Sequence, residues 1–353
     1  MNATRVIEAL AAPLDVARRG ALSAVTRRRG LTLVVGRRDT RVPLLATAQI
    51  ALLLAVTVTR PVWLFVLGPL LLGVPHLASD VRYLVLRQRV ARPVIVLACA
   101  ATLVMVALRG LPLAHVVVPG AARLEILTGG VWVVLALGAG ARERRSLLPG
   151  VAVPLVLAVG VYAAAHAGLA RVVLAQAHNV VGVAAWLWLF RRNRRAAILP
   201  LGALAMGTLL LATGATLPWA MRTGGLEGLG VNLWRVGAYL APGTAPTTGA
   251  ALALVFVFLQ AVHYAVWLVW IPQDELPGQG TLTFRMSGRG LVRDFGVVGL
   301  AIIAAGCIAL AGAATFDARA AVGAYMSLAA FHGYLELAML AYFAARGRAV
   351  TAR

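Results

Sequence analysis

Long apolar segments separated by short polar connections repeat along almost the whole chain. A helix needs about 20 apolar residues to cross a bilayer. Ten segments approach or exceed that length, at 42–59, 61–86, 93–108, 122–140, 147–167, 169–190, 197–220, 247–271, 293–313 and 318–345. The third is short for a full span unless it extends past Arg92 or Arg109. Because the strict alternation of outer-membrane barrels is absent, the pattern predicts an all-α fold, a polytopic transmembrane helical bundle of about ten spans.

Three parts are expected along the chain. Residues 1–41 are a basic N-terminal segment, residues 42–345 are the transmembrane domain, and residues 346–353 are a basic tail. From Thr4 to Val25, apolar residues recur at helical spacing, which indicates an interfacial helix on an anionic membrane surface. The alternative is a frayed basic tail that only fixes the orientation of the chain.

Composition narrows the class of protein. Apolar residues make up 61% of the chain and charged residues 13%, against about 45–50% and about 25% in soluble domains. An ordinary soluble enzyme and a disordered chain are therefore excluded. The two cysteines, Cys99 and Cys307, lie in separate apolar segments, so neither a disulfide framework nor an iron–sulfur motif is expected.

The chain carries a net charge of +21, from 33 basic and 12 acidic residues. Such an excess also occurs in nucleic-acid-binding proteins, but here most arginines lie between the spans, where they act as topology signals. With the N-terminus inside and the sides alternating, 26 arginines fall inside and seven outside. The distribution predicts cytoplasmic termini, no nucleic-acid partner, and a multi-pass protein of the bacterial inner (cytoplasmic) membrane.

Histidines inside the spans are the first candidates for chemistry. Four spans carry one each, at comparable depth, within about 10 Å at 1.5 Å per residue: His76, His178, His263 and His332. Ionisable groups within a membrane usually face a bundle interior or a cavity. The four imidazoles are therefore expected to converge, whereas His115 and His166 lie near the outer boundary and are more typical of structural residues.

Two carboxylates strengthen this expectation. Asp80 follows His76 by four residues and Glu336 follows His332 by four, so each pair shares a helix face. Imidazoles and carboxylates supply the nitrogen and oxygen ligands that iron, zinc, copper and manganese prefer. The predicted metal ligands are the four histidines with Asp80 and Glu336. For any one histidine taken alone, an interhelical hydrogen bond is the simpler interpretation, and Arg82 could instead pair with Asp80 as a structural anchor.

Further polar residues flank the histidines. The amides of Gln176, Asn179 and Gln260 are expected to orient metal-bound imidazoles through hydrogen bonds. Tyr264 and Tyr334 follow the histidines closely and are candidate catalytic proton donors. Four tryptophans could line an apolar tunnel, although a membrane-interface belt is the favoured interpretation for most of them: Trp186, Trp188, Trp267 and Trp270.

One short motif resembles a known family. GVPHLASD, residues 73–80, is similar to the G-x-PHG-x-x-D segment of the bacterial Brp/Blh β-carotene dioxygenases, multi-pass membrane proteins that hold a non-haem iron with histidines and cleave β-carotene with dioxygen. The resemblance implies an iron ligand at His76 and a supporting role for Asp80. This chain departs from the pattern at Leu77, where the motif has Gly, and it has no His-x-x-x-His pair.

Together these features predict an intramembrane non-haem metal oxygenase or oxidase, with iron as the expected metal. Its expected partners are dioxygen, a hydrophobic substrate from the bilayer such as a carotenoid or another isoprenoid, and anionic lipids at the basic N-terminus. The alternatives are a metal-ion or proton transporter that uses the same residues, and a membrane protein with haem held by pairs of histidines.

Overall fold

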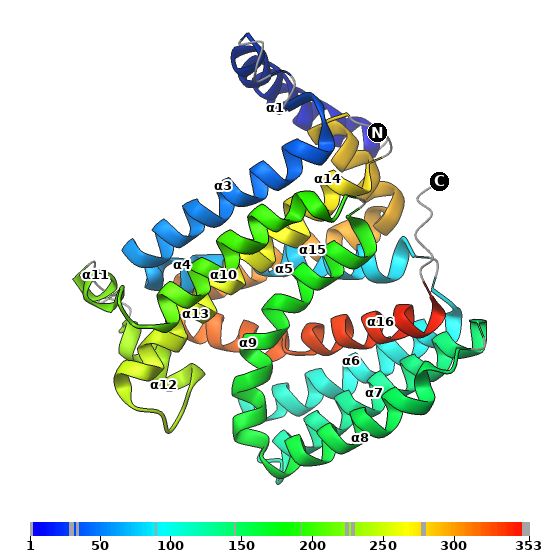
Figure 1. Cartoon of the computed structure of the whole chain (residues 1–353), viewed down its shortest axis with the longest axis vertical. Coiled ribbons are helices and arrows are strands. Elements are labelled where there is room, and N and C mark those ends of the chain that lie inside the picture. Colours follow the sequence, from blue (N-terminus) through cyan, green and yellow to red (C-terminus); the bar gives the residue numbers. More distant parts are fainter. Residues whose placement is uncertain are drawn as a thin grey trace.

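The computed structural model of the chain is built from helices (Figure 1). It describes residues 3–27, 32, 35–88, 90–144, 146–191, 193–222, 226, 230–276 and 280–347. Over these residues the only β-type pairing is one isolated antiparallel bridge between Leu226 and Val231. The predicted all-α class is confirmed.

The helices follow one another with short connections. They are α1 (Ala3–Thr26), α3 (Arg38–Thr59), α4 (Pro61–Leu67), η1 (Gly68–Leu72), α5 (Gly73–Asp80), η2 (Val81–Leu86), α6 (Arg92–Leu113), α7 (Ala121–Arg144), α8 (Leu148–Ala165), α9 (Ala167–Ala185), η3 (Trp186–Phe190), η4 (Arg195–Ala197), α10 (Ile198–Ala212), α11 (Leu217–Arg222), α12 (Leu233–Leu240), α13 (Pro246–Ala265), η6 (Val266–Trp270), α14 (Ile271–Glu275), α15 (Phe284–Leu328) and α16 (Phe331–Arg346).

Nine helical stretches in the described ranges are long and apolar enough to cross a membrane. The last of them, 284–346, spans 63 residues and contains both final spans predicted from the sequence. Helix α6 extends beyond both ends of the short segment 93–108, which resolves its length. The span predicted at 197–220 is too long, because α10 ends at Ala212 and Gly214 turns the chain with a φ of 72°. These features identify a multi-pass membrane protein.

The long helix α15 is interrupted twice. Gly296 has a φ of 67° and a ψ of 180°, a conformation that glycine adopts without a Cβ penalty. Asp317 is extended, and its carboxylate accepts a hydrogen bond of 2.8 Å from the backbone N–H of Ala320. An aspartate in this geometry caps the N-terminus of the helical segment that follows it.

Helix α13 lies at the centre of the bundle. Nearly every residue from Gly249 to Tyr264 is buried, and the helix contacts α3, α9, α10 and α12. By contrast, α8 lies at the periphery, where Ala164 is its one buried residue. Figure 1 shows α11 and α12 at the left end of the bundle and α14 at the other, with the span helices running between them. A residue on α13 is therefore remote from both water and lipid.

Short π-helical segments interrupt the helices that carry the predicted histidines. Segments η1 and η2 flank α5, which carries His76, while η3 follows α9 and η6 follows α13. A π-helical turn inserts an extra residue into the i to i−4 ladder, and such turns are frequent at functional sites. Each π-helical turn rotates the residues that follow it about the helix axis, so they lie on a different face of the helix.

The basic N-terminal segment forms a helix that packs against α15. Asp15 is buried and its carboxylate accepts backbone hydrogen bonds of 2.8 Å from Phe284 and 3.3 Å from Arg285, at the first turn of α15. Ile7 lies so close to Gly288 that no side chain would fit there. Residues 4–25 are helical and packed, not frayed, and the position of this helix on an anionic membrane surface stays a prediction.

We expect acid to loosen this contact. Burial raises the pKa of Asp15, but hydrogen bonds from Phe284 and Arg285 outweigh it and hold the pKa below the ordinary value of 3.8. Because its pKa is lowered, the ionised Asp15 carboxylate stabilises the packing of α1 against α15 at pH values above 3.8. This stabilisation is lost as the pH falls below 3.8 and the carboxylate is protonated. Hydrogen exchange of α1 should accelerate in Asp15→Asn at neutral pH. Exchange should not change in Arg19→Gln, on the exposed face of the same helix; equal acceleration in both variants would contradict the role of Asp15.

Several arginines that support the predicted orientation lie outside the described residues: Arg28, Arg29, Arg89, Arg145, Arg192, Arg348 and Arg353. The same holds for most of the tail 346–353, of which Arg346 and Gly347 are described. The cytoplasmic position of both termini therefore stays a prediction.

Candidate metal centre

The four histidines predicted to converge lie together in the middle of the bundle, one each on α5, α9, α13 and α16. The ring centroid of His332 lies 4.8 Å from that of His76, 5.1 Å from that of His178 and 5.7 Å from that of His263. The rings of His263 and His76 are 5.4 Å apart. Residues distant in the sequence thus form one imidazole cluster.

Four side chains of this cluster are close enough to share one metal ion. One ligand atom from each lies within 4.8 Å of all the others, and every member is buried: His76, Asp80, His263 and His332. Of the remaining predicted ligands, His178 touches this group through its ring, 5.5 Å from that of His263. Glu336 is fully buried, with one carboxylate oxygen 3.4 Å from Nε2 of His263.

Backbone carbonyls accept hydrogen bonds from three of the four imidazoles. Nδ1 of His178 donates to the carbonyl of Leu174 at 3.2 Å, and Nδ1 of His263 donates to that of Asn179 at 3.4 Å. Nδ1 of His332 donates to the carbonyl of Ala329. Since a carbonyl can only accept, these contacts place the proton on Nδ1 and leave Nε2 with a free lone pair. Metal-bound histidines in proteins are held in the same way.

The atoms that face the centre of the cluster have no hydrogen-bond partner among the described residues. They are Nε2 of His76, His263 and His332, both carboxylate oxygens of Asp80 and Oε2 of Glu336. Buried polar atoms without partners cost about 1–3 kcal/mol each, and more when charged. A cation bound between His76, Asp80, His263 and His332 would supply a partner to a ligand atom of each, so these donor atoms fit a metal ion.

Asp80 is free of the arginine that could have neutralised it. Nε of Arg82 instead pairs with Asp294 on α15, at 2.7 Å. Residues two positions apart do not share a helix face. Asp80 therefore points into the imidazole cluster, and the anchoring role considered for Arg82 is not observed.

The two candidate proton donors lie in different places. The ring of Tyr264 packs against that of His76, with centroids 4.6 Å apart. Tyr334 turns away from the histidines, and its hydroxyl donates to Glu125 at 3.2 Å. A third tyrosine, Tyr325, was not anticipated, and its hydroxyl lies 3.4 Å from Nδ1 of His76. Gly73 leaves the space that the Tyr325 ring occupies.

The amides do not contact the rings through their side chains. Nε2 of Gln176 donates to the carbonyl of Leu252, and Nε2 of Gln260 donates weakly to the sulfur of Met326. The side chain of Asn179 donates to its own helix at Ala175, and only its backbone carbonyl reaches His263. The orienting contacts expected from amides come from main-chain carbonyls instead.

A cavity of about 370 Å³ opens beside the cluster. His76, His178, His263 and His332 line it, together with Tyr264 and Tyr325. At another part of its wall lies Glu125, which is 1% exposed and forms ion pairs of 2.6 Å with Arg109 and 2.7 Å with Arg171. The cavity therefore has the candidate metal ligands on one part of its wall and a compact ion-pair group on another.

Sequence reasoning missed Glu125. It lies only a few residues inside the predicted span 122–140 and is not among the predicted site residues. A usable signal was present, because Arg109 at the end of the span 93–108 and Arg171 at the start of the span 169–190 lie at the same predicted membrane face. Charges of opposite sign at one depth on adjacent helices are typical of buried pairs.

For three of the four tryptophans, the interpretation as a membrane-interface belt is wrong. Trp186, Trp267 and Trp270 are buried at the helix contacts. Their indole N–H groups donate to Asp274 at 2.7 Å, Glu336 at 2.7 Å and Gln49 at 2.6 Å. A buried indole needs such a hydrogen-bond acceptor. Here the acceptors are two acids and one amide on other helices, and the sequence pattern did not indicate these pairings.

Close packing at Gly182 fixes the position of His263. A Cβ atom at this position would lie 2.9 Å from Nδ1 of His263 and 3.0 Å from Nε1 of Trp267. We expect Gly182→Ala to displace both rings and to weaken metal binding by about 10–100-fold, the usual loss when a ligand's support is disturbed. Metal titration followed by tryptophan fluorescence would measure it. Gly202→Ala on α10, which meets open space, is the control, and equal affinity of both variants for the metal would contradict the argument.

The two remaining histidines lie apart from the cluster. His166 is exposed, and its Nδ1 donates to the carbonyl of Tyr162 at 3.0 Å. His115 is exposed in the connection after α6, with a φ of 60°. Both match the structural interpretation given to them from the sequence.

No protein-family model, curated protein or solved structure matches this chain. The resemblance of residues 73–80 to the Brp/Blh motif is therefore untested by these comparisons. What the chain does must be argued from the arrangement of its own residues.

Proposed function

We propose that this protein is an intramembrane non-haem iron oxygenase or oxidase of a bacterial inner membrane that acts on a lipid-soluble substrate. The observation that carries the proposal is the set of buried imidazole nitrogens and carboxylate oxygens without partners, gathered beside a cavity. Nitrogen and oxygen donors of this kind suit iron, while zinc, copper and manganese accept similar sets.

The chain's own residues prepare the site for such chemistry. Main-chain carbonyls fix the tautomers of His178, His263 and His332, so that Nε2 is free to bind. The indole of Trp267 holds Glu336 beside His263. Iron bound there would supply the redox chemistry that dioxygen needs in order to react with an organic substrate.

The cavity supports a hydrophobic substrate. Its lining includes Phe256, Leu174 and Met326 as well as the histidines. Tyr264 lies against His76 and could hold or donate a proton at its hydroxyl. A carotenoid or another isoprenoid is the proposed substrate class, since such molecules partition into the bilayer and residues 73–80 resemble the Brp/Blh motif.

Two other functions use the same residues less well. Haem held by pairs of histidines needs a flat macrocycle between the rings of each pair, whereas these four rings surround one small centre with centroid distances of 4.8–5.7 Å. A transporter needs a path from the cluster to both faces of the membrane. Behind the cluster, Ser79 donates to the carbonyl of the buried Trp267 at 2.7 Å, which joins α5 to η6 on that side.

Oxygen uptake by the iron-loaded protein in lipid nanodiscs would test the proposal. A panel of isoprenoid lipids, β-carotene included, should contain at least one that stimulates uptake and incorporates ¹⁸O from ¹⁸O₂. Neither response should occur in His263→Ala, while His166→Ala should behave as wild type. Iron or manganese flux into proteoliposomes, with no oxygen uptake for any lipid, would overturn the proposal in favour of transport.

A further inference from the structure

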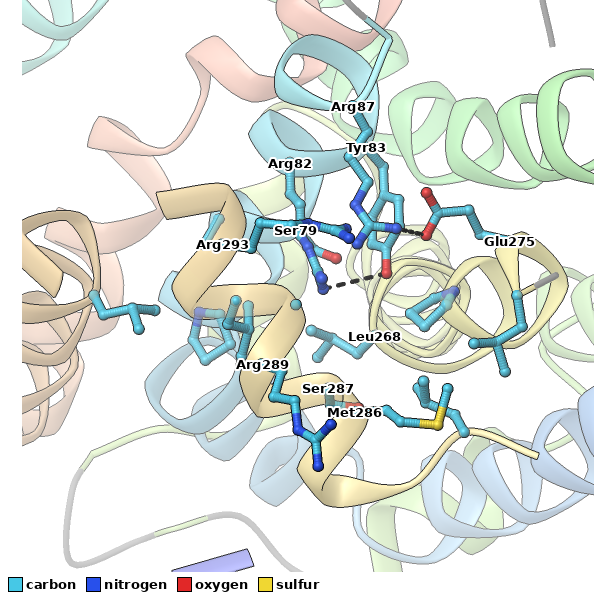
Figure 2. A pocket seen from close by; sticks show the side chains of 18 of the residues that line it. Ser79, Arg82, Tyr83, Arg87, Leu268, Glu275, Met286, Ser287, Arg289 and Arg293 are labelled. Carbon is cyan, nitrogen blue, oxygen red and sulfur yellow. Dashed lines mark hydrogen bonds and ion pairs between the residues drawn. The ribbon is translucent and has the colours of Figure 1, made fainter. Parts of the chain in front are cut away.

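A second cavity, of about 590 Å³, lies on the other side of α5 and shares no lining residue with the cavity at the metal centre. It lies between η2, α14 and the first turns of α15, at the end of the bundle where α1 packs. Figure 2 shows the side chains that line it. No part of the proposed oxygenase chemistry uses this cavity.

Four arginines line the cavity: Arg82, Arg87, Arg289 and Arg293. Asp294 pairs with three of them, Glu275 with Arg87 and Glu8 of α1 with Arg289. Four guanidinium groups thus share three carboxylates, and the group keeps a net positive charge.

Several guanidinium N–H groups stay available to a ligand. Nε of Arg82 donates to the carboxylate of Asp294, and its Nη1 donates to the hydroxyl of Tyr83. Its Nη2 lies against Gly290. The carboxylate of Glu8 lies 2.6 Å from Nε of Arg289, and that arginine side chain is 58% exposed. In Figure 2 the guanidinium groups of Arg82 and Arg87 lie beside Tyr83, and that of Arg289 extends from the adjacent turn of α15.

The rest of the wall is apolar. It includes Leu268, Leu276, Leu282, Leu291, Leu300 and Ile303. A cavity that is charged at one part and apolar at another, at the end of a membrane bundle, matches an amphiphile with an anionic head and alkyl chains. Arginine binds phosphate oxygens through pairs of parallel N–H groups, which makes it the preferred residue for phosphate recognition.

We infer that this cavity binds the phosphate headgroup of an anionic phospholipid from the membrane leaflet on the side of α1. The guanidinium groups of Arg82, Arg87 and Arg289 receive the phosphate, and the leucine-lined wall takes the first part of the acyl chains. Because Glu8 of α1 already pairs with Arg289, the phosphate competes with that carboxylate for the guanidinium group. Free phosphate offers the same oxygens but gains nothing from the apolar wall.

Native mass spectrometry of the full chain in detergent would test this inference, with dioleoyl phosphatidylglycerol, dioleoyl phosphatidylcholine and inorganic phosphate as probes. We expect one phosphatidylglycerol to bind at least about tenfold more tightly than phosphatidylcholine, as a charge-assisted contact would give. Arg289→Gln should weaken phosphatidylglycerol about 5–10-fold. Glu8→Gln, which frees Arg289, should leave binding unchanged or tighten it.

Arg319→Gln is the matched control, since it removes the same charge from an exposed position at the other end of α15. Equal losses in Arg289→Gln and Arg319→Gln, or equal affinity for the two lipids, would overturn the inference. Inorganic phosphate that binds as tightly as phosphatidylglycerol would identify a free-anion site and overturn the lipid assignment. Metal content should stay unchanged in Arg289→Gln, so this outcome is independent of the proposed oxygenase.

Discussion

Replacing His332 with alanine is expected to weaken metal binding by more than about 100-fold, because even the loss of a ligand's supporting partner costs about 10–100-fold. His332 is buried, and its ring lies 4.8–5.7 Å from those of the other three histidines. Wild-type protein should carry about one iron per chain, with no Soret band, and the variant should carry less than about a tenth of that. Elemental analysis and an optical spectrum of purified protein would measure both.

His166→Ala is the control for this experiment, since that ring is exposed and bonded to its own helix. It should keep the full metal content. Freshly purified, folded wild-type protein that binds no added metal would contradict the metal centre. A strong Soret band would instead favour haem held by pairs of histidines.

Asp80→Asn is expected to have opposite effects on stability in the presence and absence of metal. Asp80 is fully buried, and no described residue forms a hydrogen bond with either carboxylate oxygen. With metal bound, the variant should lose about 10–100-fold in affinity and melt earlier. After the metal is removed by chelation, Asp80→Asn should be more stable than wild type by about 1–3 kcal/mol. The reason is that the wild-type protein buries a carboxylate without a partner, whereas the variant buries a neutral amide. Thermal unfolding in both conditions would measure the reversal.

Asp294→Asn supplies the comparison, because that carboxylate pairs with Arg82 and Arg87 at 2.7 Å each. Removal of its charge leaves Arg82 without a carboxylate partner and Arg87 with Glu275 alone, so this variant should be destabilised with or without metal. A shift of the same sign for Asp80→Asn in both conditions would show that Asp80 is structural.

The spans could be predicted from sequence because bilayer thickness dictates the length of an apolar segment. The ends of the spans were harder to predict, because local backbone geometry determines where a helix stops. Gly214 ended one predicted span early, and the breaks at Gly296 and Asp317 divide α15 without a change in hydropathy. Glycine conformation and side-chain capping are short-range effects that a hydropathy average does not record.

The convergence of the histidines could also be predicted, because depth in the membrane follows from position along a span. Position around the helix axis could not, since the π-helical segment η1, just before α5, changes the face on which His76 and Asp80 lie. The carbonyls that hold the imidazoles carry no sequence signal at all.

The candidate site draws its residues from α5, α9, α13 and α16, which are far apart in the sequence. During synthesis these helices enter the membrane in chain order, so His76 is inserted long before His332 can join it. A shared ion cannot be captured until α16 has packed against α7 and α9. Metal loading would then report on completed assembly, and a chain that stalls before α16 would expose carboxylates and imidazoles that quality-control proteases could recognise as unfinished.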